Sequence, residues 1–283
     1  MLFDILKAKS NIITNNLFID LWKKKQGGSP EPEPGPEPEP EPVIEIVSWA
    51  DGTTAQIKAM LDAEKAGKLN TSDYWNVGDK RTFHLSAISA YSVGGVEIIA
   101  AQPEEDVEIA LAHKGLYTDA NNQTVRWVVS FVDCLNNQGK MNGTNTNSGS
   151  WDDAAIRTYL NDYVFPAMSA DDRALFTQFK TITANPYNGT VLETSVDYLA
   201  LCAEKEIFGA ETYGNVTEAN ALTQFDYYKT ISTHTKYADG NLCYWWERSP
   251  TKDFDSAFCL SNVGNASFNP AGQNQGISPF GCI

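Results

Sequence analysis

The chain has 283 residues, 42% of them hydrophobic, and a formal net charge of -15 at pH 7. This length suffices for one large domain or two ordinary domains, each with a real core. The acidic balance argues against nucleic acid as a partner, because phosphates select basic surfaces. An acidic body also repels an anionic cell envelope unless a cation or a local polar site overrides the repulsion.

The first 28 residues predict a short helical attachment peptide rather than a domain. Asp4 and Lys7 interrupt the opening apolar run, so we expect no signal peptide. No run of about eighteen apolar residues occurs anywhere, so we expect no membrane insertion. A frayed surface helix is the alternative, but an anchor that docks on another protein explains the apolar residues better. These residues are Leu2, Phe3, Ile5, Leu6, Ile12, Ile13, Leu17, Phe18, Leu21 and Trp22.

Residues 29–42 predict a stiff spacer. From Pro30 to Pro42 the sequence alternates Pro and Glu with one break at Gly35. Proline fixes the backbone near the polyproline conformation and the glutamates repel one another, which gives a solvated segment of roughly 40 Å. We therefore expect a single folded body over residues 43–283, held apart from the attachment peptide.

The first half of the body predicts one helix followed by strands. Thr53 or Thr54 is a helix cap, and the helix presents Ile57, Met60 and Leu61 on one face and ends near Gly67. After it, apolar runs rich in β-branched residues predict strands. Their ranges are 81–86, 96–100, 107–112 and 125–132.

The middle of the body predicts two main helices. Residues 150–153 read Ser-Trp-Asp-Asp, a capping box ahead of an apolar helical pattern at 156–163. Ser169 predicts a second cap, before Leu175, Phe176 and Phe179. Further strands are expected over 180–183 and 198–202. Strands, two helices and strands again indicate an α+β domain with mixed antiparallel sheets.

The last forty residues carry the strongest functional signal. An aromatic strand meets the Arg248-Ser249-Pro250 corner, then a short apolar strand, a stretch of Asn, Ser, Gly and Gln, and a final strand from Ile277 to Ile283. Small polar residues between strands are typical of a replaceable recognition surface. A pair of irregular loops on a sheet is the structural alternative. Arg248 is expected to be a structural hydrogen-bond hub rather than a ligand contact.

Neither cysteine nor histidine patterns predict a metal or a cofactor. The five cysteines have wide spacing and no CxxC pair, so buried thiols are favoured over a disulfide framework or a zinc site. Cys259 and Cys282 become neighbours only if their strands pair. The three histidines are isolated in the sequence, and a calcium site at Glu247, Asp253 and Asp255 matches no loop signature.

Four segments together resemble a known family. They are DYWNVGDKRTFHLSAISA, MNGTNTNSGSWDDAAIRTYLND, DYLALCAEKEIFG and YWWERSP…GISPFGC. The combination resembles a widespread uncharacterised domain family of phages and gut Firmicutes. That family is similar to the C-type-lectin-like fold of formylglycine-generating enzymes and of the variable proteins diversified by retroelements. The resemblance covers roughly residues 47–283 and implies a C-type-lectin-like fold whose helices contain Trp151 and Leu175.

The resemblance implies a phage virion protein of the tail-fibre or receptor-binding type, made in the host cytoplasm. Residues 1–25 would bind other virion proteins, and the body would recognise a host-surface glycan or protein, with homo-oligomerisation left open. A structural decoration protein and, less favoured, a formylglycine-generating-type enzyme are the alternatives. Trp245 and Trp246 alternate across a strand, so one is expected in the core and the other exposed. The expected ligand-binding residues are Trp246, Glu247, Phe254, Asp255, Asn262, Asn265, Ser267, Asn269 and Asn274.

Overall fold

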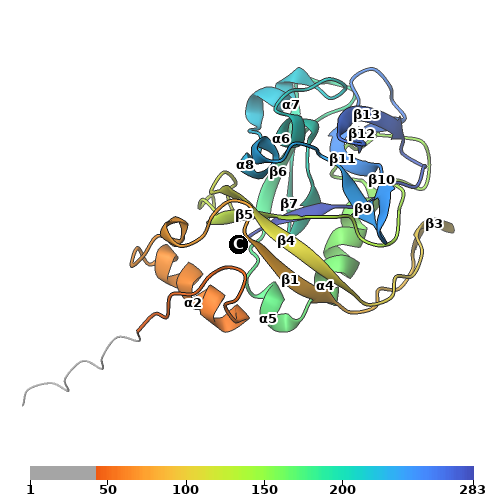
Figure 1. Cartoon of the computed structure of the whole chain (residues 1–283). Coiled ribbons are helices and arrows are strands. Elements are labelled where there is room, and N and C mark those ends of the chain that lie inside the picture. The colour runs from red at the N-terminus through yellow and green to blue at the C-terminus, as the bar shows by residue number, and fades with distance from the viewer. Residues whose placement is uncertain (1–42) are drawn as a thin grey trace, which may run out of the picture. The chain divides into compact units, whose positions relative to one another are not determined.

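The computed structural model describes residues 43–283, in which helices are few and strands form several small antiparallel sheets (Figure 1). Residues 44–283 form one compact unit. The predicted attachment peptide, 1–28, and the predicted spacer, 29–42, lie outside the described residues. The α+β class expected from the sequence is confirmed for the body.

A five-stranded antiparallel sheet organises the body. Its order is β1-β4-β5-β14-β8, so the last strand of the chain lies inside the sheet, between β5 and β8. Every residue of β5, β14 and β8 is buried, which explains their continuous apolar sequences. The bounds are β1 Lys80–Leu85, β4 Glu105–Lys114, β5 Trp127–Phe131, β8 Leu199–Leu201 and β14 Pro279–Cys282.

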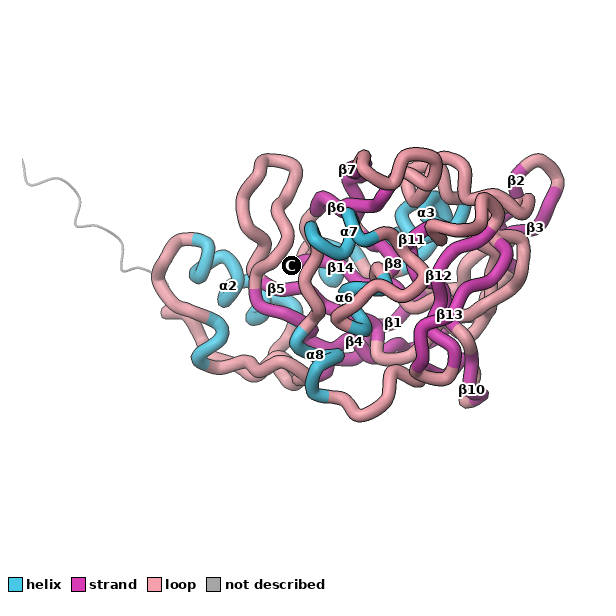
Figure 2. Tube along the Cα trace, turned by 90° about the horizontal axis from the view of Figure 1, so that it is seen from above, coloured by secondary structure: helices cyan, strands magenta, loops and turns pink. Residues whose placement is uncertain are grey.

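Four smaller antiparallel sheets surround this one. Three are two-stranded hairpins, and the fourth has the order β11-β12-β13. In both views helix α2 and the β11-β12-β13 sheet lie at opposite ends of the body (Figures 1 and 2). The hairpins are β2 Tyr91–Val93 with β3 Val96–Ile99, β6 Phe179–Ala184 with β7 Leu192–Asp197, and β9 Lys236–Ala238 with β10 Asn241–Cys243; the fourth sheet has β11 Trp245–Pro250, β12 Ala257–Asn262 and β13 Asn265–Pro270.

The helix after residue 53 forms as predicted. Helix α2 spans Thr54–Lys65, and Thr53 and Gln56 cap it reciprocally, which satisfies backbone donors that the first turn leaves open. Ile57, Met60 and Leu61 are buried. The other described helices are much shorter. They are η1 Thr71–Asp73, α3 Ala155–Tyr159, η2 Leu160–Val164, α4 Phe165–Ala167, α5 Ala170–Arg173, α6 Glu204–Phe208, α7 Val216–Ala221 and α8 Asp226–Thr230.

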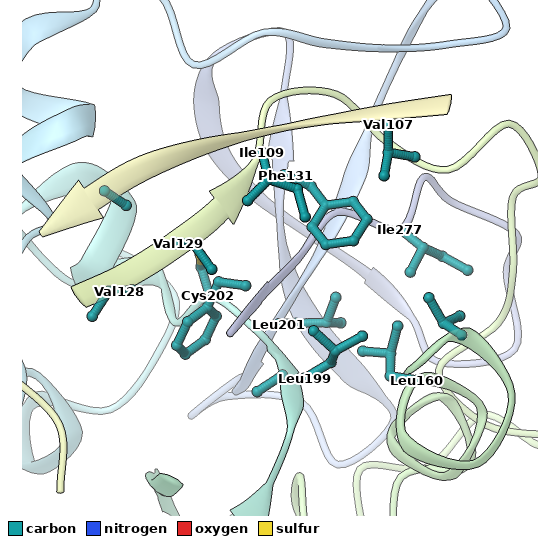
Figure 3. Packing of buried hydrophobic residues seen from close by; sticks show 14 of the residues in the cluster. Val107, Ile109, Val128, Val129, Phe131, Leu160, Leu199, Leu201, Cys202 and Ile277 are labelled. Atoms are coloured by element: carbon teal, nitrogen blue, oxygen red, sulfur yellow. The ribbon is translucent and has the colours of Figure 1, made fainter. Parts of the chain in front are cut away.

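The core lies on the central strands of the five-stranded sheet. Figure 3 shows β4 and β5 side chains meeting residues from η2, β8 and the segment before β14. All six tryptophans of the described residues, from Trp49 to Trp246, are essentially inaccessible to solvent. Replacing a large buried aromatic by Ala typically costs about 3–5 kcal/mol, so these residues dominate the stability. The labelled core residues are Val107, Ile109, Val128, Val129, Phe131, Leu160, Leu199, Leu201, Cys202 and Ile277.

The capping box predicted at Ser150 is wrong. Ser150 has a left-handed φ of 55°, and its hydroxyl donates to the Ala184 carbonyl at 3.0 Å. The helical run begins only at Ala155, whose backbone N–H donates to the side-chain oxygen of Asn142 at 2.9 Å. The Asn142 side chain thus caps this helix in place of the Ser150 side chain that the local pattern predicted.

The second predicted main helix is also wrong in extent. Ser169 does cap a helix, but α5 covers only Ala170–Arg173. Leu175 and Phe176 are buried outside it, and the Thr177 backbone N–H donates to the Cys282 carbonyl at 2.8 Å. Pairing with the C-terminal strand therefore ends the helix before its apolar pattern is complete.

The polar stretch after Leu260 forms a hairpin rather than irregular loops. Strand β12 runs to Asn262 and pairs with β13 in unbroken register. Val263 and Gly264 make the turn with φ values of 49° and 84°. Two left-handed residues match the twist of a two-residue hairpin, and Val is an unusual residue there. This hairpin, Ala257–Pro270, is called the polar hairpin below.

Candidate functional site

Arg248 of β11 is the centre of a buried polar frame. Its side chain is fully inaccessible to solvent and makes a bidentate pair with Glu206 of α6, at 2.6 and 2.8 Å. It also donates to the Leu201 carbonyl of β8 at 2.9 Å. One guanidinium therefore joins β11, β8 and α6, and the predicted structural role is confirmed.

Glutamates from α6 and α7 extend this frame. Glu204 accepts hydrogen bonds from the backbone N–H groups of residues 212–214, at 2.8 to 3.2 Å. Glu218 accepts from the Ala184 N–H at 2.7 Å and from the Ser249 hydroxyl at 2.5 Å. These carboxylates fix the α6–α7 connection against β6 and β11, because each bond crosses between elements.

Two further carboxyl groups of the frame, those of Glu211 and Glu247, are buried and accept no hydrogen bond from an N–H or hydroxyl donor. Glu211 meets the carboxyl of Glu204, with which it forms a hydrogen bond when it is protonated. Burial raises the pKa of Glu211 to about 11, and burial among the neighbouring glutamates raises the pKa of Glu247 well above its usual range. Burial also raises the pKa of Glu218 to about 7. The negative charge of this glutamate cluster is thus reduced in three ways: some carboxyls stay protonated, Glu206 pairs with Arg248, and Glu204 accepts from backbone N–H groups.

The polar hairpin presents two different faces. Side chains alternate along a strand, so Asn265, Ser267 and Asn269 point to the side opposite Ala266, Phe268 and Pro270. We call the first three the polar face. Ser267 pairs with Leu260 and Asn269 pairs with Phe258. The polar face therefore continues the core side of the sheet out to its edge strand.

An aromatic stack lies on the other face of the hairpin. Phe254 stacks on Phe268 with ring centroids 4.7 Å apart and an interplanar angle of 19°, and Tyr213 lies 5.1 Å from Phe268. Phe254 remains 48% exposed. The segments after Pro250 and around Asn265 are therefore neighbours, as the sequence predicted, and the α6–α7 connection adjoins them through Tyr213.

Two of the nine predicted ligand residues are not on a surface. Trp246 is fully buried, and its indole N–H donates to the Gly139 carbonyl at 2.8 Å. Trp245, which is not one of the nine, is buried as well, and its indole N–H donates to the His234 carbonyl at 3.2 Å. Glu247 is fully buried in the frame. The alternation rule failed because β11 has protein packed on both of its faces.

The other seven predicted residues are accessible to solvent. Six of them are polar, and their side chains have no hydrogen-bond partner among residues 43–283. Asn262, Ser267 and Asn269 are half-buried, whereas Asp255, Asn265 and Asn274 are exposed. A partly desolvated amide without a partner gains most from an external hydrogen bond, because the protein leaves it unsatisfied.

No sequence pattern pointed to the residues that anchor this surface. The buried amide of Asn147 donates to the carbonyls of Phe254 and Ala257, at 2.9 and 3.1 Å. The Thr251 hydroxyl donates to the Phe254 carbonyl at 2.7 Å. Nothing in the composition of the 142–149 region distinguishes Asn147 from its neighbours. Phe268 was also missed, although an aromatic residue within a polar stretch is a signal for it.

Within residues 43–283, no three His, Cys, Asp or Glu side chains are placed to hold one metal ion. His84 and His113 each pair with a single aspartate, Asp106 at 2.8 Å and Asp226 at 3.0 Å. All five cysteines are buried, as expected. Cys259 and Cys282 belong to different sheets, so their strands do not pair. No helix in the described part of the chain is long and apolar enough to cross a membrane.

Comparison with known proteins gives one match. A family model described as "Domain of unknown function (DUF6273)" matches residues 122–283, from the turn before β5 to the end of the chain. The matched region includes the Arg248 frame, the polar hairpin and the aromatic stack. No curated protein and no solved structure matches the chain. Because the family model covers more than half of the sequence, the chain belongs to the DUF6273 family.

Proposed function

We propose that the chain is a phage virion protein of the tail-fibre or receptor-binding type. Its body would carry a C-type-lectin-like arrangement that presents the edge strand β13 to a host surface, with the polar face on one side of the strand and the aromatic stack on the other. Residues 1–28 would attach it to other virion proteins, and residues 29–42 would hold the body away from them. The carrying observation is the set of solvent-accessible polar side chains without partners, held by a buried and tightly bonded frame.

The chemistry of the surface favours a neutral polyhydroxyl ligand such as a glycan. Asn and Ser side chains both donate and accept, and Phe254 offers an exposed ring edge and face. The net charge of -15 disfavours a polyanionic receptor, because like charges slow the encounter. Rigid anchoring by Asn147 and Thr251 lowers the entropic cost of binding.

A structural decoration role has one observation in its favour. Strand β13 is the last strand of its sheet, so it presents unpaired backbone groups along one edge. A strand of a neighbouring virion subunit would pair with that edge by β-augmentation. Such a role uses the backbone of β13 rather than the side chains of the polar face.

An enzyme of the formylglycine-generating type has less support. Burial raises the pKa of Cys259 and Cys282 well above the usual thiol range. A thiol held protonated is a poor nucleophile. The two C-terminal cysteines are therefore better suited to packing than to catalysis.

Binding by the full chain to bacterial cells and to a glycan array distinguishes these roles. The test variant carries Asn265→Ala, Ser267→Ala and Asn269→Ala, and the control carries Ser92→Ala and Glu97→Ala on the exposed β2–β3 hairpin. We expect the test variant to lose at least about tenfold in affinity for the cells or glycans bound by the wild type, since each lost hydrogen bond costs about 0.5–1.5 kcal/mol. The control should bind normally.

Absence of binding by the wild type to any cell or glycan would reject the receptor role. If the full chain nevertheless incorporates into particles, the decoration role replaces it. Equal binding by the test variant and the wild type, with both folded, would place the receptor site elsewhere on the body.

A further inference from the structure

Two cysteines that are distant in sequence meet in the body. Cys134 lies beyond the end of β5, and Cys243 is the last residue of β10, 109 positions later. Their sulfur atoms are 3.1 Å apart. This is closer than ordinary contacts between nonbonded carbon atoms, about 3.5–4.0 Å, and about 1 Å longer than a disulfide bond. Among the described residues, no other pair of cysteine sulfurs is in contact.

The backbone around the pair is fixed on both sides. The Cys134 N–H donates to the Tyr237 carbonyl at 2.9 Å, and the Gly276 N–H donates to the Tyr244 carbonyl at 2.7 Å. Gly276 packs directly against both sulfurs, since a Cβ there would lie 2.7 Å from Cys134 Sγ and 2.8 Å from Cys243 Sγ. A glycine at this position leaves room for the sulfur pair. The sulfurs must approach each other by about 1 Å for the bond to form.

The surroundings shift the pKa values of the two thiols in opposite directions. The hydrogen bond between them lowers the pKa of Cys243, with the nearby Lys236 ammonium acting in the same direction. Burial is the main cause that raises the pKa of Cys134. A surface pocket of about 330 Å³ reaches Cys134, and its lining includes Glu105, Asp106, Asp133 and Asp239. A small reagent that enters this acidic pocket therefore meets Cys134, with Cys243 behind it.

We propose that Cys134 and Cys243 form a dithiol pair that closes to a disulfide by exchange with a small-molecule disulfide. The Cys243 thiolate takes the proton of Cys134 across the 3.1 Å contact, and Cys134 Sγ attacks one sulfur of the reagent. The first reagent thiolate leaves and takes up the proton from Cys243. Cys243 then attacks Cys134 Sγ and releases the second reagent thiolate, which takes up a proton from solvent. Two protein thiols are oxidised, and one reagent disulfide is reduced to two thiols.

The bridge would connect the β9–β10 hairpin to the end of β5. Strand β10 leads through Tyr244 directly into β11, which carries Arg248. The closed form would thus tighten the frame beneath the candidate binding surface once the protein meets an oxidising environment. This inference depends only on the cysteine geometry and is independent of the proposed function.

The test uses the full-length, reduced, folded protein with two reagents of opposite charge. We expect dicationic cystamine to oxidise two thiols per chain, and to do so faster than anionic oxidised glutathione because the pocket is acidic. Peptide mapping by mass spectrometry should join Cys134 to Cys243 and leave Cys202, Cys259 and Cys282 reduced. The closed form should melt about 5–10 °C higher, and dithiothreitol should reverse the shift.

Either single variant, Cys134→Ser or Cys243→Ser, should abolish the reversible shift in melting temperature. If a variant fails to fold, peptide mapping of the oxidised wild-type protein still tests the proposal. Five thiols that stay reduced in the folded protein after prolonged exposure to cystamine would overturn the proposal. A bridge between any other pair of cysteines would overturn it equally.

Discussion

Arg248 and the polar hairpin lie within the same forty residues of sequence, yet they differ in what their polar groups contact. The Arg248 guanidinium is surrounded by acceptors from several elements. The side chains of the polar face have no partner within residues 43–283. Polar composition therefore does not distinguish a structural residue from a recognition residue. The hydrogen-bond partners of the side chain make this distinction, and they depend on the tertiary structure.

Removing Arg248 should produce the largest change in stability. Arg248→Ala leaves Glu206 buried without its bidentate partner, which typically costs about 3–5 kcal/mol. Denaturant unfolding measures the loss, with the exposed Lys252→Ala as a control that stays within about 0.5 kcal/mol. Adding Glu206→Gln to Arg248→Ala should recover part of the loss. A loss below about 1 kcal/mol would mean that Arg248 is not the centre of the frame.

The buried glutamates of the frame predict a dependence of stability on pH, to which Glu105 of β4, also with a pKa raised by burial to about 7, adds in the same direction. A carboxyl with a raised folded pKa binds more protons in the folded state, so stability is fully present below its unfolded pKa and falls as pH rises through the folded value. For Glu218, shifted from 4.5 to about 7, the loss between about pH 5.5 and pH 8 is roughly 2 kcal/mol.

Glu218→Gln imitates the protonated form and should flatten this decline, whereas the exposed Glu97→Gln should leave it unchanged. Denaturant unfolding at the two pH values measures both variants. A wild-type stability that rises over this interval would contradict the assignment of Glu218 as a group with a raised pKa.

Asn147 connects the frame to the surface, and its loss should have a moderate effect. Asn147→Ala removes two hydrogen bonds, but the Thr251 hydroxyl still bonds the Phe254 and Ala257 carbonyls. We therefore expect a loss of about 1 kcal/mol. Amide hydrogen exchange of residues 251–257 should accelerate while exchange in β5 stays unchanged. Faster exchange across the whole body would instead mean that Asn147 supports the global fold.

The polar face should be the most tolerant region. Asn265→Ala, Ser267→Ala and Asn269→Ala break no hydrogen bond with residues 43–283, so each should cost at most about 0.5 kcal/mol. Thermal unfolding of the triple variant checks this. A destabilisation above about 2 kcal/mol would show that these half-buried side chains support packing.

Local patterns predicted the elements whose determinants are local. Thr53 with Gln56 caps α2 as expected, and the apolar runs around 107–112 and 125–132 form β4 and β5.

The failures occurred where a distant residue decides the outcome. Ser150 bonds Ala184 instead of capping a helix, and Trp246 is covered on the face that alternation left exposed. A glutamate is ordinarily expected at the surface, but Glu247 is buried among other glutamates. Its burial follows from the packing of α6, α7 and β11, which the sequence pattern does not reveal. For the candidate site, the sequence identified the polar stretch, but its division into a polar face and an aromatic stack depends on the hairpin register.

Two libraries displayed on a cell surface can separate the structural role of the Arg248 frame from the recognition role of the polar face. Each library randomises three residues. One library varies Asn265, Ser267 and Asn269, and the other varies Trp246, Glu247 and Arg248. Protease resistance reports folding, and binding to the bacterial cells recognised by the wild type reports function. We expect most variants in the first library to fold but to lose or change cell binding, and most variants in the second library not to fold. A first library that mostly unfolds, or that folds with cell binding unchanged, would contradict it.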